Sequence, residues 1–162
     1  MFARFCAWRG GVWGERSDSN LGDVRMRDEF KVTQLVDELG NFISKWPWQI
    51  WATLTFRSSF RISNQKLKSH WDKLISVIGK LQGTEPYWVR SVEVGREQTV
   101  QHLHALFGNI DLPAREIPRL WHPGTGNARA EAYDPERRAA WYIAKNPEAV
   151  EFSPNLPPPA TD

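Results

Sequence analysis

The sequence is poor in cysteine and has no long apolar run. Cys6 is the only cysteine among 162 residues, which excludes an internal disulfide framework and a cysteine-rich zinc site and is typical of a reducing compartment. No stretch approaches the ~18 consecutive apolar residues of a membrane-spanning helix. The opening residues MFARFCAWRGG lack a long apolar segment before a small-residue cleavage site, so no signal peptide is predicted. We therefore expect a cytoplasmic protein without membrane association.

The chain also lacks a strong charge of either sign. A net charge of +2 is compatible with nucleic-acid binding but does not predict it, because that inference requires basic residues clustered on one face. The Walker motif G-x-x-x-x-G-K-[ST] is missing, so this chain carries no helicase motor. Tryptophan, by contrast, is abundant, with nine residues. Tryptophans either pack in a core or, where exposed, stack on bases.

Hydrophobic periodicity predicts one domain of mixed α and β structure. Residues 1–27 are expected to be an irregular arm, residues 28–147 the domain, and proline-rich residues 148–162 an unstructured tail. A period of three to four residues predicts helices and a period of two predicts strands. We expect a helix ending before Pro47, a strand over 48–59, a helix from Ser63 or Asn64, a hairpin of strands over 87–95 and 100–108, a strand over 127–134 and a helix over 134–147. This order predicts an α+β fold, a mostly antiparallel sheet with helices on one face.

Two histidines alternate with apolar residues in the strand over 100–108. Successive side chains of a strand point to opposite faces, so His102 and His104 are expected to share the face that is turned away from the core. If the hairpin loop holds an even number of residues, Glu93 of the preceding strand lies on the same face beside them. Glu97, in the expected loop, is the competing carboxylate. The core face is expected to contain Leu103, Ala105 and Phe107.

Two imidazoles and a carboxylate on one open face form a candidate metal site. Three ligands with open positions suit a divalent ion that also binds a substrate oxygen. The carboxylate favours Mg²⁺ or Mn²⁺ over closed structural zinc. A second interpretation stays open, in which His102 and His104 are ordinary core or surface histidines. The sequence also does not decide between Glu93 and Glu97.

The last expected helix carries a tyrosine with basic residues at helical spacing. Lys145 follows Tyr142 by three residues and Arg138 precedes it by four, so a continuous helix would hold all three on one side. Two nearby cations favour the phenolate form of a tyrosine, and a phenolate is a nucleophile that can form a covalent intermediate. Lys145 would neutralise a phosphate or orient a metal ligand. The alternative is that Tyr142 only packs and Lys145 is solvated.

In this order, the segments WATLTF (residues 51–56), HLH (102–104) and YIAK (142–145) resemble the three motifs of the HUH endonucleases. They are most similar to the single-tyrosine rolling-circle replication initiators of plasmids, phages and single-stranded DNA viruses. The resemblance covers residues 48–146. It implies a ferredoxin-like antiparallel sheet, with helices on one face and the metal and tyrosine on the other.

The resemblance also implies a chemistry. His102, His104 and Glu93 would bind Mg²⁺ or Mn²⁺, and Tyr142, assisted by Lys145, would be catalytic. The tyrosine would attack single-stranded DNA at a replication origin, leaving a 5′-phosphotyrosine and a free 3′-hydroxyl. The expected partners are that strand and a host helicase and polymerase in the cytoplasm of a bacterial host. The residues expected to contact the strand are Trp51, Thr53, Thr55, Arg57 and Arg138.

Two other functions remain open from the sequence. A single-tyrosine HUH transposase would use the same chemistry, and a relative that has lost catalysis would only bind DNA. Tyr133 lies nine residues before Tyr142, so it is not the second tyrosine, four residues away, of two-tyrosine enzymes.

Overall fold

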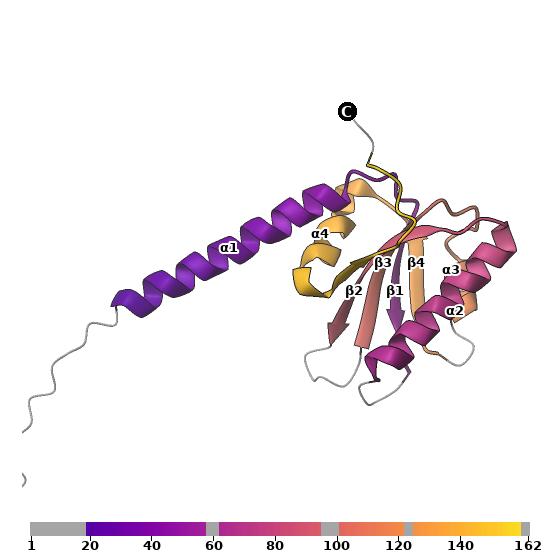
Figure 1. Ribbon diagram of the computed structural model, residues 1–162, viewed down its shortest axis with the longest axis horizontal. Helices are drawn as coiled ribbons and strands as arrows, with labels where there is room; N and C mark the ends of the chain where they lie inside the picture. The colour runs from indigo at the N-terminus through magenta and orange to yellow at the C-terminus, as the bar shows by residue number, and fades with distance from the viewer. Residues whose placement is uncertain (1–18, 58–61, 95–100, 122–124, 160–162) are drawn as a thin grey trace, which may run out of the picture. The chain divides into compact units, whose positions relative to one another are not determined.

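The computed structural model describes most of the chain and divides it into two units, residues 1–32 and residues 33–162. The fold described here is that of the second unit (Figure 1). Among the described residues, no helix combines the length and the apolar character needed to cross a membrane. The described residues are 19–57, 62–94, 101–121 and 125–159, with side chains described from residue 31 onward.

The second unit contains a five-stranded antiparallel sheet in the order β4-β1-β3-β2-β5. Its first four strands and two helices follow one another as β1-α2-β2-β3-α3-β4, the element order of a ferredoxin-like fold. The predicted α+β class is thereby confirmed. The bounds of these elements are Ile50–Thr55 for β1, Asn64–Gln82 for α2, Tyr87–Val94 for β2, Gln101–Gly108 for β3, Glu116–Trp121 for α3, Ala128–Ala132 for β4 and Val150–Phe152 for β5.

Helices α2 and α3 pack on one face of the sheet and form the larger core (Figure 1). The side chain of Ser63 caps α2 by accepting a hydrogen bond from the backbone amide of Lys66, and Gly83 ends the helix in the left-handed region at φ 78°. Trp71 of α2 stacks on Phe107 of β3, with ring centres 5.6 Å apart. The buried residues that β3 contributes to this core are Leu103, Ala105 and Phe107, as their alternation predicts.

The opposite face of the sheet is partly covered, where the sequence predicts an open face. Helix α4 (Ala139–Ala144) packs there, together with the C-terminal end of α1 (Ser19–Ile43). Val89 of β2 and Leu106 of β3 are fully buried in this second core. The sheet therefore has a hydrophobic core on each face, and the candidate site lies beside the smaller one.

Two predicted segments differ from the structure. Residues 19–27 of the expected irregular arm belong to helix α1, while residues 1–18 lie outside the described residues. The prediction of an unstructured tail is wrong for residues 150–152, because β5 pairs with residues 89–91 of β2. The hydroxyl of Ser153 then accepts a hydrogen bond from the backbone amide of Trp88 at 3.0 Å. These backbone pairings stabilise a segment whose proline content indicates disorder.

Candidate functional site

His102 and His104 lie on the central strand β3, on the face opposite to α2. Their register neighbours on β1 are Thr55 and Thr53. The hydroxyl of Thr55 lies 2.9 Å from Nδ1 of His102, and that of Thr53 lies 3.2 Å from Nδ1 of His104. A hydrogen bond at one ring nitrogen fixes the orientation of an imidazole and leaves the other nitrogen as its functional atom. Both histidines are therefore positioned through Nδ1, with Nε2 as the working nitrogen.

Glu93 of β2 is the carboxylate that meets these histidines. Six residues, 95–100, separate β2 from β3, and this even number places Glu93 opposite His102 in the register. The prediction that Glu93 shares the histidine face is confirmed. Its Oε2 lies 3.1 Å from Nε2 of His104, diagonally across the two strands. Glu97, the competing carboxylate, lies outside the described residues.

Tyr142 and Lys145 reach the same carboxylate from the C-terminal end of α4. Lys145 Nζ donates to Oε1 of Glu93 at 2.9 Å, and the hydroxyl of Tyr142 lies 3.4 Å from Oε2. The Tyr142 ring meets His104 edge-on, with ring centres 4.7 Å apart. Tyr142 is nevertheless 43% exposed, so a macromolecular substrate can reach its hydroxyl. Three side chains, from β3 and α4, thus converge on the carboxylate of Glu93.

Arg138 does not join this group, and the prediction that it lies beside Tyr142 on a continuous helix is wrong. A short 3₁₀ turn (Pro135–Arg137) precedes it, and Arg138 itself adopts the left-handed conformation, with φ 54° and ψ 35°. Helix α4 begins only after this residue. The Arg138 guanidinium lies over the ring of Trp141, 4.7 Å from its centre. One of the two expected cations is therefore directed elsewhere, and Lys145 supplies the charge at the site.

The charges at the site follow from these contacts. The hydrogen bond from Lys145 holds the pKa of Glu93 below its usual value, although partial burial opposes this effect. Burial lowers the pKa of His104, and the adjacent Glu93 carboxylate only partly counteracts it. At neutral pH we therefore describe an ionised Glu93 beside a neutral His104. Because a carboxylate can only accept, Nε2–H of His104 donates to Glu93 and the Thr53 hydroxyl donates to Nδ1.

The distances allow a partial test of metal binding. Two ligands of an octahedral ion, each about 2.1 Å from it, lie roughly 3 Å apart, which matches the 3.1 Å between Nε2 of His104 and Oε2 of Glu93. His102 is more distant, since its ring centre lies 6.3 Å from that of His104. Within the described residues, no three His, Cys, Asp or Glu side chains approach closely enough to hold a metal ion. Two of the three expected ligands therefore fit, and the third would have to turn toward them.

The residues expected to contact DNA have several different surroundings. Thr53 and Thr55 face the histidines rather than solvent, which makes them positioning groups. Trp51 is half-buried and packs beside Tyr142, with ring centres 6.0 Å apart. Arg57, two residues beyond β1, is exposed, as a strand contact requires. Among these residues, Arg57 and Arg138 are exposed cations, and the Arg138 guanidinium lies over Trp141.

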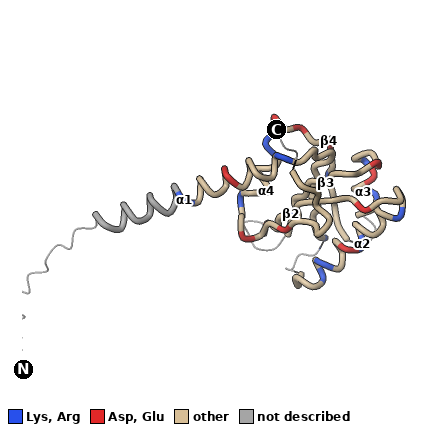
Figure 2. Tube along the Cα trace, turned by 45° about the horizontal axis from the view of Figure 1, so that its top comes forward, with Lys and Arg blue, Asp and Glu red and all other residues tan. Residues whose placement is uncertain are grey.

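Sequence reasoning missed Arg137 and the surface around it. The Arg137 guanidinium lies over the Trp51 ring at 5.6 Å and pairs with Glu131 of β4 at 2.7 Å. A hollow of about 90 Å³ opens there between β1, β4 and Arg137. Basic residues of the described chain are spread over several elements and do not gather on one (Figure 2). The weak net charge is the one sequence signal that anticipates this distribution.

Comparison of the chain with protein-family models, with curated proteins and with solved structures gives no significant match.

Proposed function

We propose that this protein nicks single-stranded DNA and transfers the strand, with Tyr142 as the nucleophile, as the single-tyrosine HUH replication initiators do. The observation that carries the proposal is the convergence of Tyr142, His104 and Lys145 on the carboxylate of Glu93. An exposed tyrosine beside a lysine, a histidine and a carboxylate is a set suited to phosphodiester transesterification. The resemblance of three ordered sequence motifs to those of that family supports the same assignment.

In the proposed reaction, the Tyr142 oxygen forms a bond to phosphorus while the bond from phosphorus to the 3′ oxygen breaks. The phenol loses its proton, and Oε2 of Glu93 is the nearest carboxylate oxygen, 3.4 Å away. The departing 3′ oxygen takes up a proton, so the products are a free 3′-hydroxyl and a 5′-phosphotyrosyl link. Lys145 stabilises the negative charge that develops on the phosphoryl oxygens. Attack by the 3′-hydroxyl on the link would reverse the step and rejoin the strand.

Glu93, His104 and His102 would hold a divalent ion such as Mg²⁺ or Mn²⁺. When bound, such an ion polarises the scissile phosphate and offsets developing charge. The residues themselves must prepare for it, because neutral His104 has to carry its proton on Nδ1 instead of on Nε2, where it now donates to Glu93. The Thr53 hydroxyl would then accept from Nδ1 instead of donating to it. Ion binding would be weaker at low pH, because protons compete with the ion for the imidazoles and the carboxylate.

The partner in this proposal is single-stranded DNA at a replication origin, and host helicase and polymerase would act afterwards. We assign contact with backbone phosphates to the exposed Arg57 and to Arg137, which lies over the ring of Trp51. Binding should be modest, because dispersed basic residues neutralise few phosphates at once.

The test is covalent capture of DNA. Randomised single-stranded oligonucleotides labelled at the 3′ end are incubated with the protein in Mn²⁺ or in EDTA, and adducts are resolved under denaturing conditions. The 3′ label is essential because the proposed link retains the downstream fragment. We expect a labelled adduct with wild type in Mn²⁺ and its complete loss in Tyr142→Phe.

Tyr133→Phe is the matched control. The Tyr133 hydroxyl is buried with no hydrogen-bond partner among the described residues, so its removal should leave adduct formation intact. His102→Ala tests the third ligand, and undiminished adduct formation in that variant would exclude His102 from the metal site. If wild type binds the strand yet forms no adduct, the protein is a non-catalytic DNA-binding relative and the nicking proposal is wrong.

A further inference from the structure

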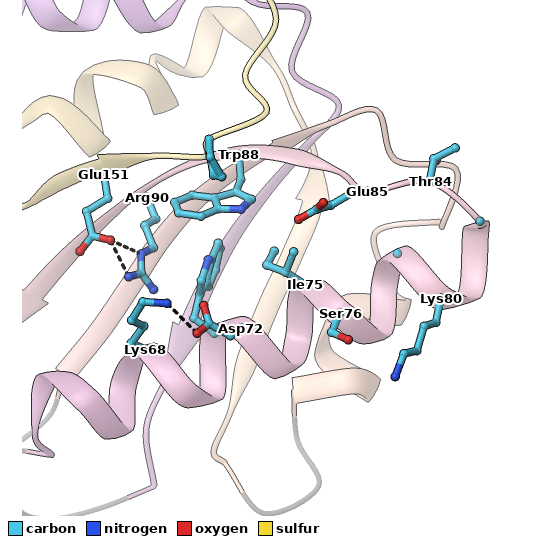
Figure 3. Close-up of a pocket in the computed structure, with 14 residues that line it drawn as sticks. Lys68, Asp72, Ile75, Ser76, Lys80, Thr84, Glu85, Trp88, Arg90 and Glu151 are labelled. Atoms are coloured by element: carbon cyan, nitrogen blue, oxygen red, sulfur yellow. Dashed lines mark hydrogen bonds and ion pairs between the residues drawn. The ribbon is translucent and has the colours of Figure 1, made fainter.

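A cavity of about 690 Å³ lies on the other side of the sheet from Tyr142, between α2 and the β2–β5 edge (Figure 3). This is the size of a small-molecule site. Arg90 projects into it from β2, on the face opposite to its neighbours Val89 and Ser91. A second hollow of about 390 Å³ adjoins it and shares Lys68, Arg90 and Glu151. The cavity therefore continues past Arg90 along the sheet edge.

Arg90 is an unusually buried charge, with only 3% of its surface exposed. Its Nε and Nη2 atoms both donate to Oε2 of Glu151, at 3.3 and 2.6 Å (Figure 3). The guanidinium lies 5.0 Å from the ring centre of Trp71 and 5.4 Å from that of Trp88. Burial of an arginine costs free energy unless its donors are paired. Two tryptophans and a carboxylate therefore hold the buried guanidinium in one defined position.

Two residues that line this cavity each carry a buried donor without a hydrogen-bond partner in the described part of the chain. The donors are Nη1 of Arg90 and Nε1 of Trp71. Trp71 is 1% exposed, so neither donor belongs to an exposed side chain. A buried donor without a partner is destabilising, because its hydrogen bond to water is lost and not replaced. Both groups can only donate, so the complementary ligand must present acceptors.

The charge of the cavity narrows the ligand class. Its lining contains three basic and three acidic side chains, and the charge of Arg90 is already neutralised by Glu151. A polyanion would meet carboxylates on entry, whereas a neutral acceptor would not. The Trp88 indole and Ile75 supply apolar wall. Unpaired donors, balanced charges and an aromatic wall together favour a flat, neutral ring that carries carbonyl oxygens as the ligand. The charged side chains of the lining are Lys68, Asp72, Lys80, Glu85, Arg90 and Glu151.

We propose that this cavity binds a carbonyl-bearing nucleobase, with Arg90 Nη1 and Trp71 Nε1 donating to its acceptors and Trp88 packing against the ring. Aromatic side chains stack on any base, and arginine donates to base carbonyls. The base belongs either to a free nucleoside or to a single strand whose next nucleotide occupies the adjoining hollow. The inference does not depend on the nicking proposal, because its residues and its face of the sheet are separate from Tyr142.

The experiment measures binding of thymidine and deoxyguanosine by calorimetry, and of labelled decathymidylate by fluorescence anisotropy in EDTA. Ser76→Trp fills the cavity from an exposed position of α2. Leu81→Trp adds the same ring to this helix at a 60% exposed position that is not part of the cavity lining. We expect Ser76→Trp to raise the Kd at least about tenfold, because the added ring takes the space of the base and keeps it from at least one donor, and Leu81→Trp to leave the Kd unchanged.

Trp71→Phe removes the Nε1 donor and part of one ring. Because Trp71 is a buried core residue that stacks on Phe107, we expect a lower melting temperature as well as weaker base binding. Binding is therefore compared at a temperature at which circular dichroism shows the variant to be folded. Nucleoside binding that Ser76→Trp abolishes supports a free-nucleoside site. Binding of decathymidylate alone, weakened by Ser76→Trp but not by Leu81→Trp, supports a strand site. If neither probe binds, or if both tryptophan variants bind like wild type, the proposal is wrong.

Discussion

Replacement of Glu93 by glutamine tests the electrostatics of the candidate site without changing its shape. The amide keeps one oxygen that can accept from His104, but its NH2 group replaces the oxygen that accepts from Lys145, so the charge and that one hydrogen bond are removed. The Lys145 side chain is 57% exposed, so its pair with Glu93 contributes no more than about 1 kcal/mol. The contact with buried His104 becomes neutral, and charge assistance there is worth about 1 kcal/mol. We expect Glu93→Gln to lower the free energy of unfolding by about 1–2 kcal/mol at pH 7.

The stability difference between wild type and Glu93→Gln should depend on pH, and the pKa shift of Glu93 gives its direction. The hydrogen bond from Lys145 lowers the pKa of Glu93 in the folded protein. The ionised carboxylate therefore adds stability that is fully present above its unfolded pKa of about 4.3. That stability is lost as the pH falls through the lower folded pKa. The difference between wild type and Glu93→Gln should be constant from pH 7 to about pH 5 and should then shrink toward pH 3.

Urea unfolding at a series of pH values measures this difference. Asp72→Asn is the control, because it neutralises an exposed carboxylate paired with Lys68, and we expect a change of no more than about 0.5 kcal/mol. A Glu93→Gln protein that is as stable as wild type at pH 7 would refute the reasoning. A stability difference that stays the same at pH 3 would also refute it, because a loss of packing does not titrate.

Two further substitutions test the frame around the site. Gly126→Ala should destabilise the protein by about 1–3 kcal/mol or prevent folding, because a Cβ there would lie against the backbone carbonyl of Thr55. A urea midpoint equal to that of wild type would contradict this prediction. Thr53→Val should lower the free energy of unfolding by about 1 kcal/mol, since it removes the hydroxyl that bonds Nδ1 of His104, and unfolding at pH 7 with the neutral Thr53→Ser as control measures the effect.

The sequence predicts the sheet face of the site because strand alternation is strict. Once β2 and β3 are joined by an even number of residues, Glu93 must share a face with His102 and His104. The start of α2 is predictable for a similar reason. Serine is a preferred N-cap residue, because its hydroxyl can accept a hydrogen bond from the backbone amide three residues later, as Ser63 does from Lys66. In both cases the information lies within a few residues of the feature.

Features that depend on distant partners are not predictable in this way. Residues 150–152 form a strand only because the edge of β2 offers backbone partners there. The pair between Lys145 and Glu93 spans 52 positions of sequence. The cavity beside Arg90 likewise needs α2, β2 and β5 together. The sequence around residues 150–152 or around Lys145 does not show which distant residues they will contact.

The break at Arg138 shows how one backbone conformation determines the composition of the site. The left-handed region is uncommon for residues other than glycine, so a continuous helix is the natural expectation. With the break, the carbonyl of Arg138 accepts from the backbone amides of Trp141 and Tyr142, and α4 begins in a new direction. Three of its four buried residues are alanines, which allows the helix to approach β3 closely enough for Tyr142 to meet His104 at 4.7 Å. The site therefore depends on alanines as much as on its polar residues, and those that are fully buried in this core are Ala139, Ala140 and Ala144.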